Sequence, residues 1–142
     1  MRKGQAAMEF LMTYGWAILV VLVAIGALAY FGVLSPEKLI PERCMLQAGL
    51  ECADAKVTAS EVSLVVRNSM GTSIDISNVT IGSVCSNTTA VTLVNGGQST
   101  LTVTGCSFTP GDKMNEDLAI VYTNPETLLT HTLTGSLVRE VE

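Results

Sequence analysis

A single acidic residue, Glu9, is a candidate for chemistry because it lies at the edge of a long uncharged segment. Arg2 and Lys3 precede it, and the 25 residues from Phe10 to Leu34 carry no formal charge. A carboxylate costs about 2.5–3.5 kcal/mol at the centre of a bilayer and less near its surface. A segment that only anchors a protein gains nothing from such a group. Glu9 therefore indicates a function beyond anchoring.

The four cysteines, Cys44, Cys52, Cys85 and Cys106, all lie after the apolar segment, and none belongs to a C-x-x-C pair. This spacing argues against a zinc ribbon and against a thioredoxin-type redox motif. An even number of cysteines in an exported domain favours disulfides, with four buried thiols as the alternative. Four cysteines allow three pairings. We predict Cys44–Cys52 and Cys85–Cys106, because each of these disulfides closes a local loop.

Two N-x-[ST] triplets, beginning at Asn78 and Asn87, are candidate N-glycosylation sites of an extracellular glycoprotein. The other polar residues form no recognisable catalytic pattern: His131 is the only histidine, and no Ser or Cys lies in a nucleophile motif. The acidic sequence GDKMNED at 111–117 lacks the ligand spacing of an EF-hand and is predicted to be a solvated turn between strands. We therefore expect no enzyme activity, no cofactor and no metal.

These residues lie in two parts of the chain that differ in composition. Residues 10–34 are long enough to cross the hydrocarbon core of a bilayer, and the basic pair before them favours a cytoplasmic N-terminus. From Cys44 onward the chain has ten acidic residues against four basic ones, which argues against nucleic-acid binding. A length of 142 residues accommodates one membrane segment and one small domain.

The apolar segment is longer than the hydrophobic region of an ordinary secretory signal peptide, and no convincing A-x-A cleavage site closes it before the domain. A plain signal anchor is the alternative. That alternative leaves both the Gly4-Gln5 dipeptide and Glu9 without an explanation.

The stretch KGQAAMEF, followed by a long apolar helix, resembles the class III signal peptide of archaeal type IV pilins. In that family a membrane peptidase cuts after the glycine of a short basic leader, on the cytoplasmic side, and the apolar segment is retained. The resemblance implies that residues 1–4 are a leader and that the cut falls between Gly4 and Gln5. Glu9 then becomes the fifth residue of the mature protein, where type IV pilins typically carry an acid.

The same resemblance gives Glu9 a partner. Cleavage exposes a protonated α-amine at Gln5, and in the family the acid meets the amine of a neighbouring subunit. The amine offsets much of the cost of a carboxylate in a low dielectric, so the pair favours the correct register in a filament. The sequence has Ala7 where the family pattern has Ser, and Thr13 where it has Leu.

The expected fold class is α+β. Residues 5–43 are predicted to form a long hydrophobic helix and a neck, with the helix ending near Leu34 and a short helical neck starting in SPEK at 35–38. Residues 44–142 are predicted to form a small antiparallel β-sandwich head of immunoglobulin-like architecture. The helix is the membrane span before assembly and the filament core afterwards.

Apolar alternation in the head predicts strands at 61–68, 73–82, 90–94, 99–105, 117–123 and 127–141. In the first two of these strands alternation predicts that the following side chains point inward: Val62, Leu64, Val66, Ile74, Ile76, Val79 and Ile81. A phase slip between Ile76 and Val79 indicates a β-bulge. The sequence NGGQ between the third and fourth of these strands predicts a hairpin, and NPE between the last two predicts another turn.

Together these features predict a structural pilin subunit that polymerises through its N-terminal helix into an archaeal type IV pilus, an adhesion filament on the cell surface. The expected partners are identical copies of the chain, a prepilin peptidase, a pilus assembly platform and, for the precursor, the cell membrane. The alternatives are a minor pilin and a monomeric, membrane-anchored extracellular binding protein. Glu9 argues against the last, because an anchored monomer does not need an acid there.

Overall fold

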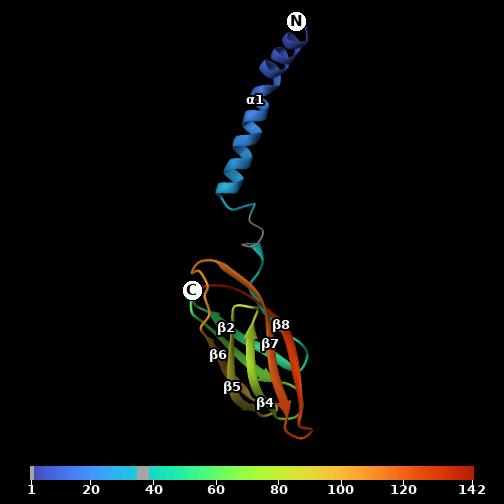
Figure 1. The fold of residues 1–142 in the computed structure, drawn as a ribbon, viewed down its shortest axis with the longest axis vertical. Helices are drawn as coiled ribbons and strands as arrows, with labels where there is room; N and C mark the ends of the chain where they lie inside the picture. The colour runs from blue at the N-terminus through green and yellow to red at the C-terminus, as the bar shows by residue number, and fades with distance from the viewer. Residues whose placement is uncertain (1, 35–38) are drawn as a thin grey trace. The chain divides into compact units, whose positions relative to one another are not determined.

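The computed structural model describes residues 2–34 and 39–142, and the chain divides into two compact units between Leu39 and Ile40 (Figure 1). The first unit contains an apolar helix, and the second, the head, contains eight strands in two antiparallel sheets. The fold class is therefore α+β. The predicted start of a helical neck at 35–38 lies outside the described residues. Removal of residues 1–4 stays a prediction.

Helix α1 (Arg2–Tyr30) ends four residues before the predicted end at Leu34. Gly32 has a φ of 73°, and its N–H donates to the Ala29 carbonyl at 3.1 Å. The Val33 N–H donates to the Leu28 carbonyl, also at 3.1 Å. These two bonds form a Schellman motif, in which a glycine in the left-handed conformation ends a helix by satisfying its last carbonyls. Gly32 is the residue in the sequence that could have indicated this end.

The head contains a five-stranded sheet in the order β1-β8-β7-β4-β5 and a three-stranded sheet in the order β2-β3-β6. All strand pairs are antiparallel. The strands are β1 (Arg43–Leu46), β2 (Leu50–Val57), β3 (Glu61–Asn68), β4 (Ile74–Ile81), β5 (Cys85–Leu93), β6 (Gln98–Thr104), β7 (Lys113–Asn124) and β8 (Leu129–Glu140).

Both sheets contribute apolar side chains to one hydrophobic core. The residues that alternation predicted to point inward are at most 1% exposed: Val62, Leu64, Val66, Ile74, Ile76, Val79 and Ile81. The predicted bulge is present, because the register of β4 shifts between Ile76 and Asn78 against both of its neighbours. The extra residue, Ser77, restores the inward phase for Val79.

The short loop that the Cys44–Cys52 disulfide closes contains the end of β1, a turn and the start of β2, and these two strands lie in different sheets. Two expectations about the head are wrong. The turn predicted at NGGQ is present, because the Gly97 N–H donates to the Val94 carbonyl at 2.8 Å, but it joins β5 of one sheet to β6 of the other and so makes no hairpin. Most of the acidic segment 111–117 lies in β7 and pairs with β8, where the sheet ladder satisfies its backbone groups. The turn predicted at NPE is confirmed, and it joins β7 to β8 as a hairpin.

Candidate functional site

The residues of the predicted processing and assembly site lie on the first turns of α1. Gly4, Gln5 and Glu9 are all exposed, and a side chain added at Gly4 would meet no atom within 4 Å. Because Gln5 and Glu9 are four residues apart, they share one face of the helix. The hydroxyl of Thr13 donates to the backbone carbonyl of Glu9 at 2.9 Å, and no described hydrogen bond or ion pair involves the Glu9 carboxylate, which is exposed.

No described residue of α1 is buried, although the helix is strongly apolar. Met12 is 80% exposed and Trp16 is 69% exposed, and large apolar side chains follow them along the whole helix. Its 29 residues span about 43 Å, compared with about 30 Å for the hydrocarbon core of a bilayer. Within residues 2–34 and 39–142, α1 is the one helix long and apolar enough to cross a membrane.

Two disulfides join the two sheets of the head, one on each side. Cys44 of β1 is bonded to Cys52 of β2, with a Cα–Cα distance of 5.8 Å. Cys85 of β5 is bonded to Cys106, which follows β6, with a Cα–Cα distance of 5.0 Å. Because β1, β5, β2 and β6 are the edge strands of their sheets, each disulfide links a pair of edges. These are the two pairs that were predicted from local loop closure. The prediction did not include that each disulfide would join one sheet to the other.

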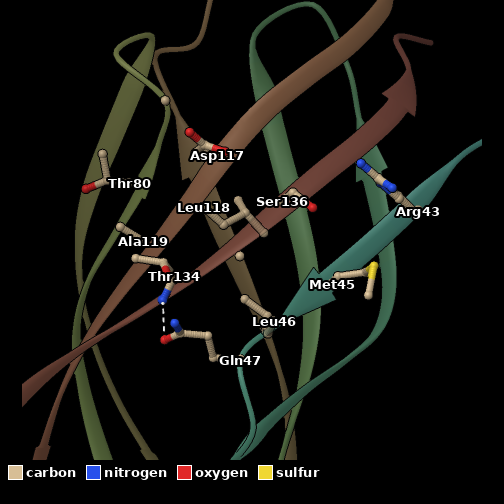
Figure 2. Close-up of a pocket in the computed structure, with 12 residues that line it drawn as sticks. Arg43, Met45, Leu46, Gln47, Thr80, Asp117, Leu118, Ala119, Thr134 and Ser136 are labelled. Atoms are coloured by element: carbon tan, nitrogen blue, oxygen red, sulfur yellow. Dashed lines mark hydrogen bonds between the residues drawn. The ribbon is translucent and has the colours of Figure 1, made fainter. Parts of the chain in front are cut away.

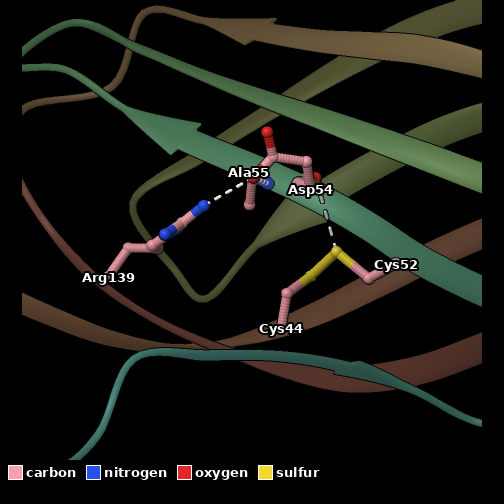
Figure 3. The surroundings of a disulfide bond; sticks show 5 residues. All are labelled: Cys44, Cys52, Asp54, Ala55 and Arg139. Atoms are coloured by element: carbon pink, nitrogen blue, oxygen red, sulfur yellow. Dashed lines mark hydrogen bonds and ion pairs between the residues drawn. A yellow bond between two sulfur atoms is a disulfide. The ribbon is translucent and has the colours of Figure 1, made fainter.

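A cluster of charges beside the first disulfide holds the segment that enters the head. Arg139 of β8 contacts Glu42 at 3.0 Å with one guanidinium nitrogen and Asp54 of β2 at 2.6 Å with the other. Figure 3 shows Arg139 reaching Asp54 next to the Cys44–Cys52 bond. Arg139 therefore links the entering segment to both sheets.

Two backbone contacts complete this attachment. The Glu140 N–H donates to the Glu42 carboxylate at 3.1 Å, and the Lys113 ammonium donates to the Ile40 carbonyl at 2.5 Å. The bond from Glu140, followed by the one from Arg139, holds the pKa of Glu42 below its usual range. We call Ile40, Glu42, Asp54, Lys113 and Arg139 the neck clamp. Sequence reasoning missed it, because Glu42 and Arg139 are 97 residues apart and no local pattern links them.

The candidate glycosylation sites lie on strands, not on loops. Asn78 is in β4, and its side-chain oxygen is buried without a hydrogen-bond partner in the described structure. Asn87 is in β5, and its amide nitrogen, the atom that would carry a glycan, donates to the Thr102 carbonyl of β6 at 3.2 Å. A glycan on Asn87 would have to replace this contact.

The remaining polar residues are dispersed over the head. His131 is exposed on β8, and its ring lies 5.5 Å from that of Tyr122. In the parts of the chain that the structure describes, no three His, Cys, Asp or Glu residues come close enough together to hold a metal ion. A groove of about 730 Å³ lies over β1, β8, β7 and β4, and Figure 2 shows the side chains that line it.

Comparison with models of known protein families gives no match, and comparison with curated proteins gives no significant sequence similarity. The functional argument therefore depends on the residues and geometry of the chain itself.

Proposed function

We propose that this chain is the precursor of an archaeal type IV pilin, which loses residues 1–4 and polymerises through α1 into an adhesion filament on the cell surface. The observation that carries the proposal is the combination, in one helix, of a fully unburied apolar surface and a single carboxylate one turn after Gln5. Each large apolar side chain gains about 1.5–3 kcal/mol when it leaves water. Lipid around the precursor, and other copies in the filament, would provide that environment.

The carboxylate supports assembly over simple anchoring. After cleavage, Gln5 would carry a protonated α-amine on the same helical face as Glu9. A carboxylate and an amine that are each unpaired in an apolar environment are costly, and pairing between neighbouring subunits removes much of that cost. This pairing favours one register between neighbouring helices. An anchored monomer gains nothing from it.

The head fits an extracellular placement. An apolar N-terminal helix and disulfides are the features expected of a membrane-anchored extracellular protein. We further propose that the architecture is immunoglobulin-like. Two antiparallel sheets that share one core support this assignment. The sequons at Asn78 and Asn87 fit the same compartment.

The proposal is tested by comparing Glu9→Ala with Glu51→Ala in cells that produce the full chain. Glu51 is an exposed residue of β2, so its change removes the same group from the head. Wild-type protein and both variants should have the intact mass of a chain that begins at Gln5. Glu9→Ala should leave the amine unpaired, at a cost of about 3–5 kcal/mol per fully buried site, and electron microscopy should show few or no filaments.

Glu51→Ala should form filaments in normal number. A mature mass that retains residue 1, or that begins after the apolar segment, would contradict the processing step. Normally processed Glu9→Ala protein that forms filaments of normal number and length would contradict the assembly role of the carboxylate.

A further inference from the structure

The head contains a charge-free segment of its own. Residues 76–111 include no Asp, Glu, Lys or Arg, and their only proline is Pro110. Two edge strands lie in this segment, β5 of the five-stranded sheet and β6 of the three-stranded sheet. Proteins usually protect an edge strand, with its unpaired backbone groups, by charged residues, proline, a bulge or short length. Of these protections β5 has only a register shift against β4, since it is nine residues long and has neither charge nor proline.

The other pair of edge strands carries the usual protections. Strand β1 has only four residues. Strand β2 has a register shift between Cys52 and Asp54, and it contains the charged residues Glu51, Asp54 and Lys56. A strand from another molecule would therefore meet a short edge at β1 and a charged, irregular edge at β2. The edges of β5 and β6 depend on a different protection.

That protection is the contact of β5 with β6, which lie side by side but belong to different sheets (Figure 1). We call this contact the β5–β6 seam. The turn at 94–97 joins the two strands at one end of the seam. Along its length the Asn87 amide donates to the Thr102 carbonyl at 3.2 Å on the exposed surface, and Leu93 is the one fully buried residue of β5. The seam is therefore weakly held along its length.

The Cys85–Cys106 disulfide closes the end of the seam that the turn leaves open. Cys85 is the first residue of β5. Cys106 is 7% exposed, and its N–H donates at 3.1 Å to the carbonyl of Ser60, which lies between β2 and β3 of the three-stranded sheet. The disulfide thus fixes the start of β5 to that sheet. Without it, β5 can move away from β6 about the turn, and the outer edges of both strands become accessible.

We infer that the Cys85–Cys106 disulfide guards this edge: it keeps β5 of one molecule from pairing with β5 of a second copy of the chain. Two identical strands can pair antiparallel about a two-fold axis, in a contact that uses the same surface of both copies. A second copy is the partner that fits, because β5 has no charge and self-pairing places no like charges opposite each other.

The guard concerns the head alone and does not rest on the proposed function. It has a consequence for that function, however. Wherever α1 gathers several copies, in a membrane or in a filament, their heads are brought to a high local concentration. A closed β5–β6 seam then leaves α1, and not a strand edge of the head, as the contact between copies.

The test is the self-association of residues 40–142, a compact unit that contains the hydrophobic core and both disulfides. Cys85→Ser combined with Cys106→Ser should form dimers with a dissociation constant at least about tenfold lower than that of the wild-type head, measured by sedimentation velocity over a concentration series. Tenfold corresponds to about 1.4 kcal/mol, which a few cross-strand pairs supply. Cys44→Ser combined with Cys52→Ser is the matched control, and it should stay monomeric because its edges are protected.

A further variant separates edge pairing from a general loss of structure. Thr88 is exposed near the middle of β5, so Thr88→Lys places like charges in any pair of β5 strands. Added to the serine pair, it should restore the monomer without restoring the disulfide, and circular dichroism should show the same β-sheet signal in each head. If the serine pair does not fold, Cys85→Ala combined with Cys106→Val repeats the test with an apolar side chain at the buried position.

The guard is overturned if the head without the Cys85–Cys106 disulfide stays monomeric, or if the control without the Cys44–Cys52 disulfide associates as tightly. It is also overturned if Thr88→Lys leaves the association unchanged. If neither variant without the Cys85–Cys106 disulfide folds, the bond is required for the fold itself, and the guard is overturned in that case too. None of these results bears on Glu9, so the proposed function stands or falls separately.

Discussion

Asn68 at the end of β3 is the one polar residue of the described structure that is buried as a whole, with an exposed fraction of 0%. Its amide nitrogen donates to the carbonyls of Thr72 and Leu93 at 2.8 and 2.9 Å. Its side-chain oxygen accepts the Met70 N–H at 2.9 Å. Asn68 lies in β3 of the three-stranded sheet. Its side chain fixes the turn between β3 and β4 and binds the end of β5, which belongs to the five-stranded sheet.

Replacing Asn68 by alanine should destabilise the head by about 3 kcal/mol. The Leu93 carbonyl becomes a buried acceptor without a partner, which costs about 1–3 kcal/mol. The groups on Thr72 and Met70 are partly buried and can be reached by water, so their lost bonds add about 0.5–1.5 kcal/mol each. In a head of this size the sum corresponds to a fall in midpoint temperature of roughly 12 °C or more.

The measurement is thermal or urea unfolding of residues 40–142, which form a compact unit of their own, followed by far-UV circular dichroism under non-reducing conditions. Asn95→Ala is the control: Asn95 makes the same kind of side-chain bond, accepting the Gly71 N–H at 3.0 Å, but on the exposed surface. That change should cost less than about 1 kcal/mol. Equal losses for the two variants, or a loss below about 1 kcal/mol for Asn68→Ala, would refute the reasoning.

Three further predictions concern the head. Changing both cysteines of the Cys85–Cys106 disulfide to serine should lower the free energy of unfolding by about 3 kcal/mol, because the bond closes a loop with a sequence separation of 21; denaturant titration measures this. Gly135→Ala should destabilise the head by about 2 kcal/mol and free β1 for hydrogen exchange, since the added carbon would lie 2.2 Å from the Met45 carbonyl oxygen. The third concerns acid: the pKa of Glu42 is lowered in the folded head, so its stabilising contribution is present above the usual carboxyl pKa and is lost as the pH falls through the folded value. Glu42→Gln should therefore flatten the acid side of the stability–pH profile, and an unchanged profile would contradict the clamp.

The sequence by itself determined the features that depend on local periodicity. The charge-free segment predicts α1, because in a bilayer a single apolar segment can satisfy its own backbone groups only as a helix. Alternation in β3 and β4 predicted which side chains form the core, and the phase slip after Ile76 predicted the bulge. The disulfide pairing followed from loop length. Glu9 was identified as the single acid beside an uncharged segment, and Gly4 and Gln5 were identified from the resemblance of KGQAAMEF to a class III signal peptide; the function of all three stays a prediction.

Only the tertiary structure decided how the strands are shared between the sheets. Alternation records which face of a strand is buried and does not record which strand lies beside it, so a turn sequence at 95–98 predicted a hairpin where the chain crosses between sheets. Strands β1 and β2 were missed because they are short or irregular edge strands with little alternation. The contact between Arg139 and Glu42 joins charges from opposite ends of the head's amino-acid sequence. Such a contact is set by where the packed core brings two surfaces together, and no local pattern in the sequence encodes it.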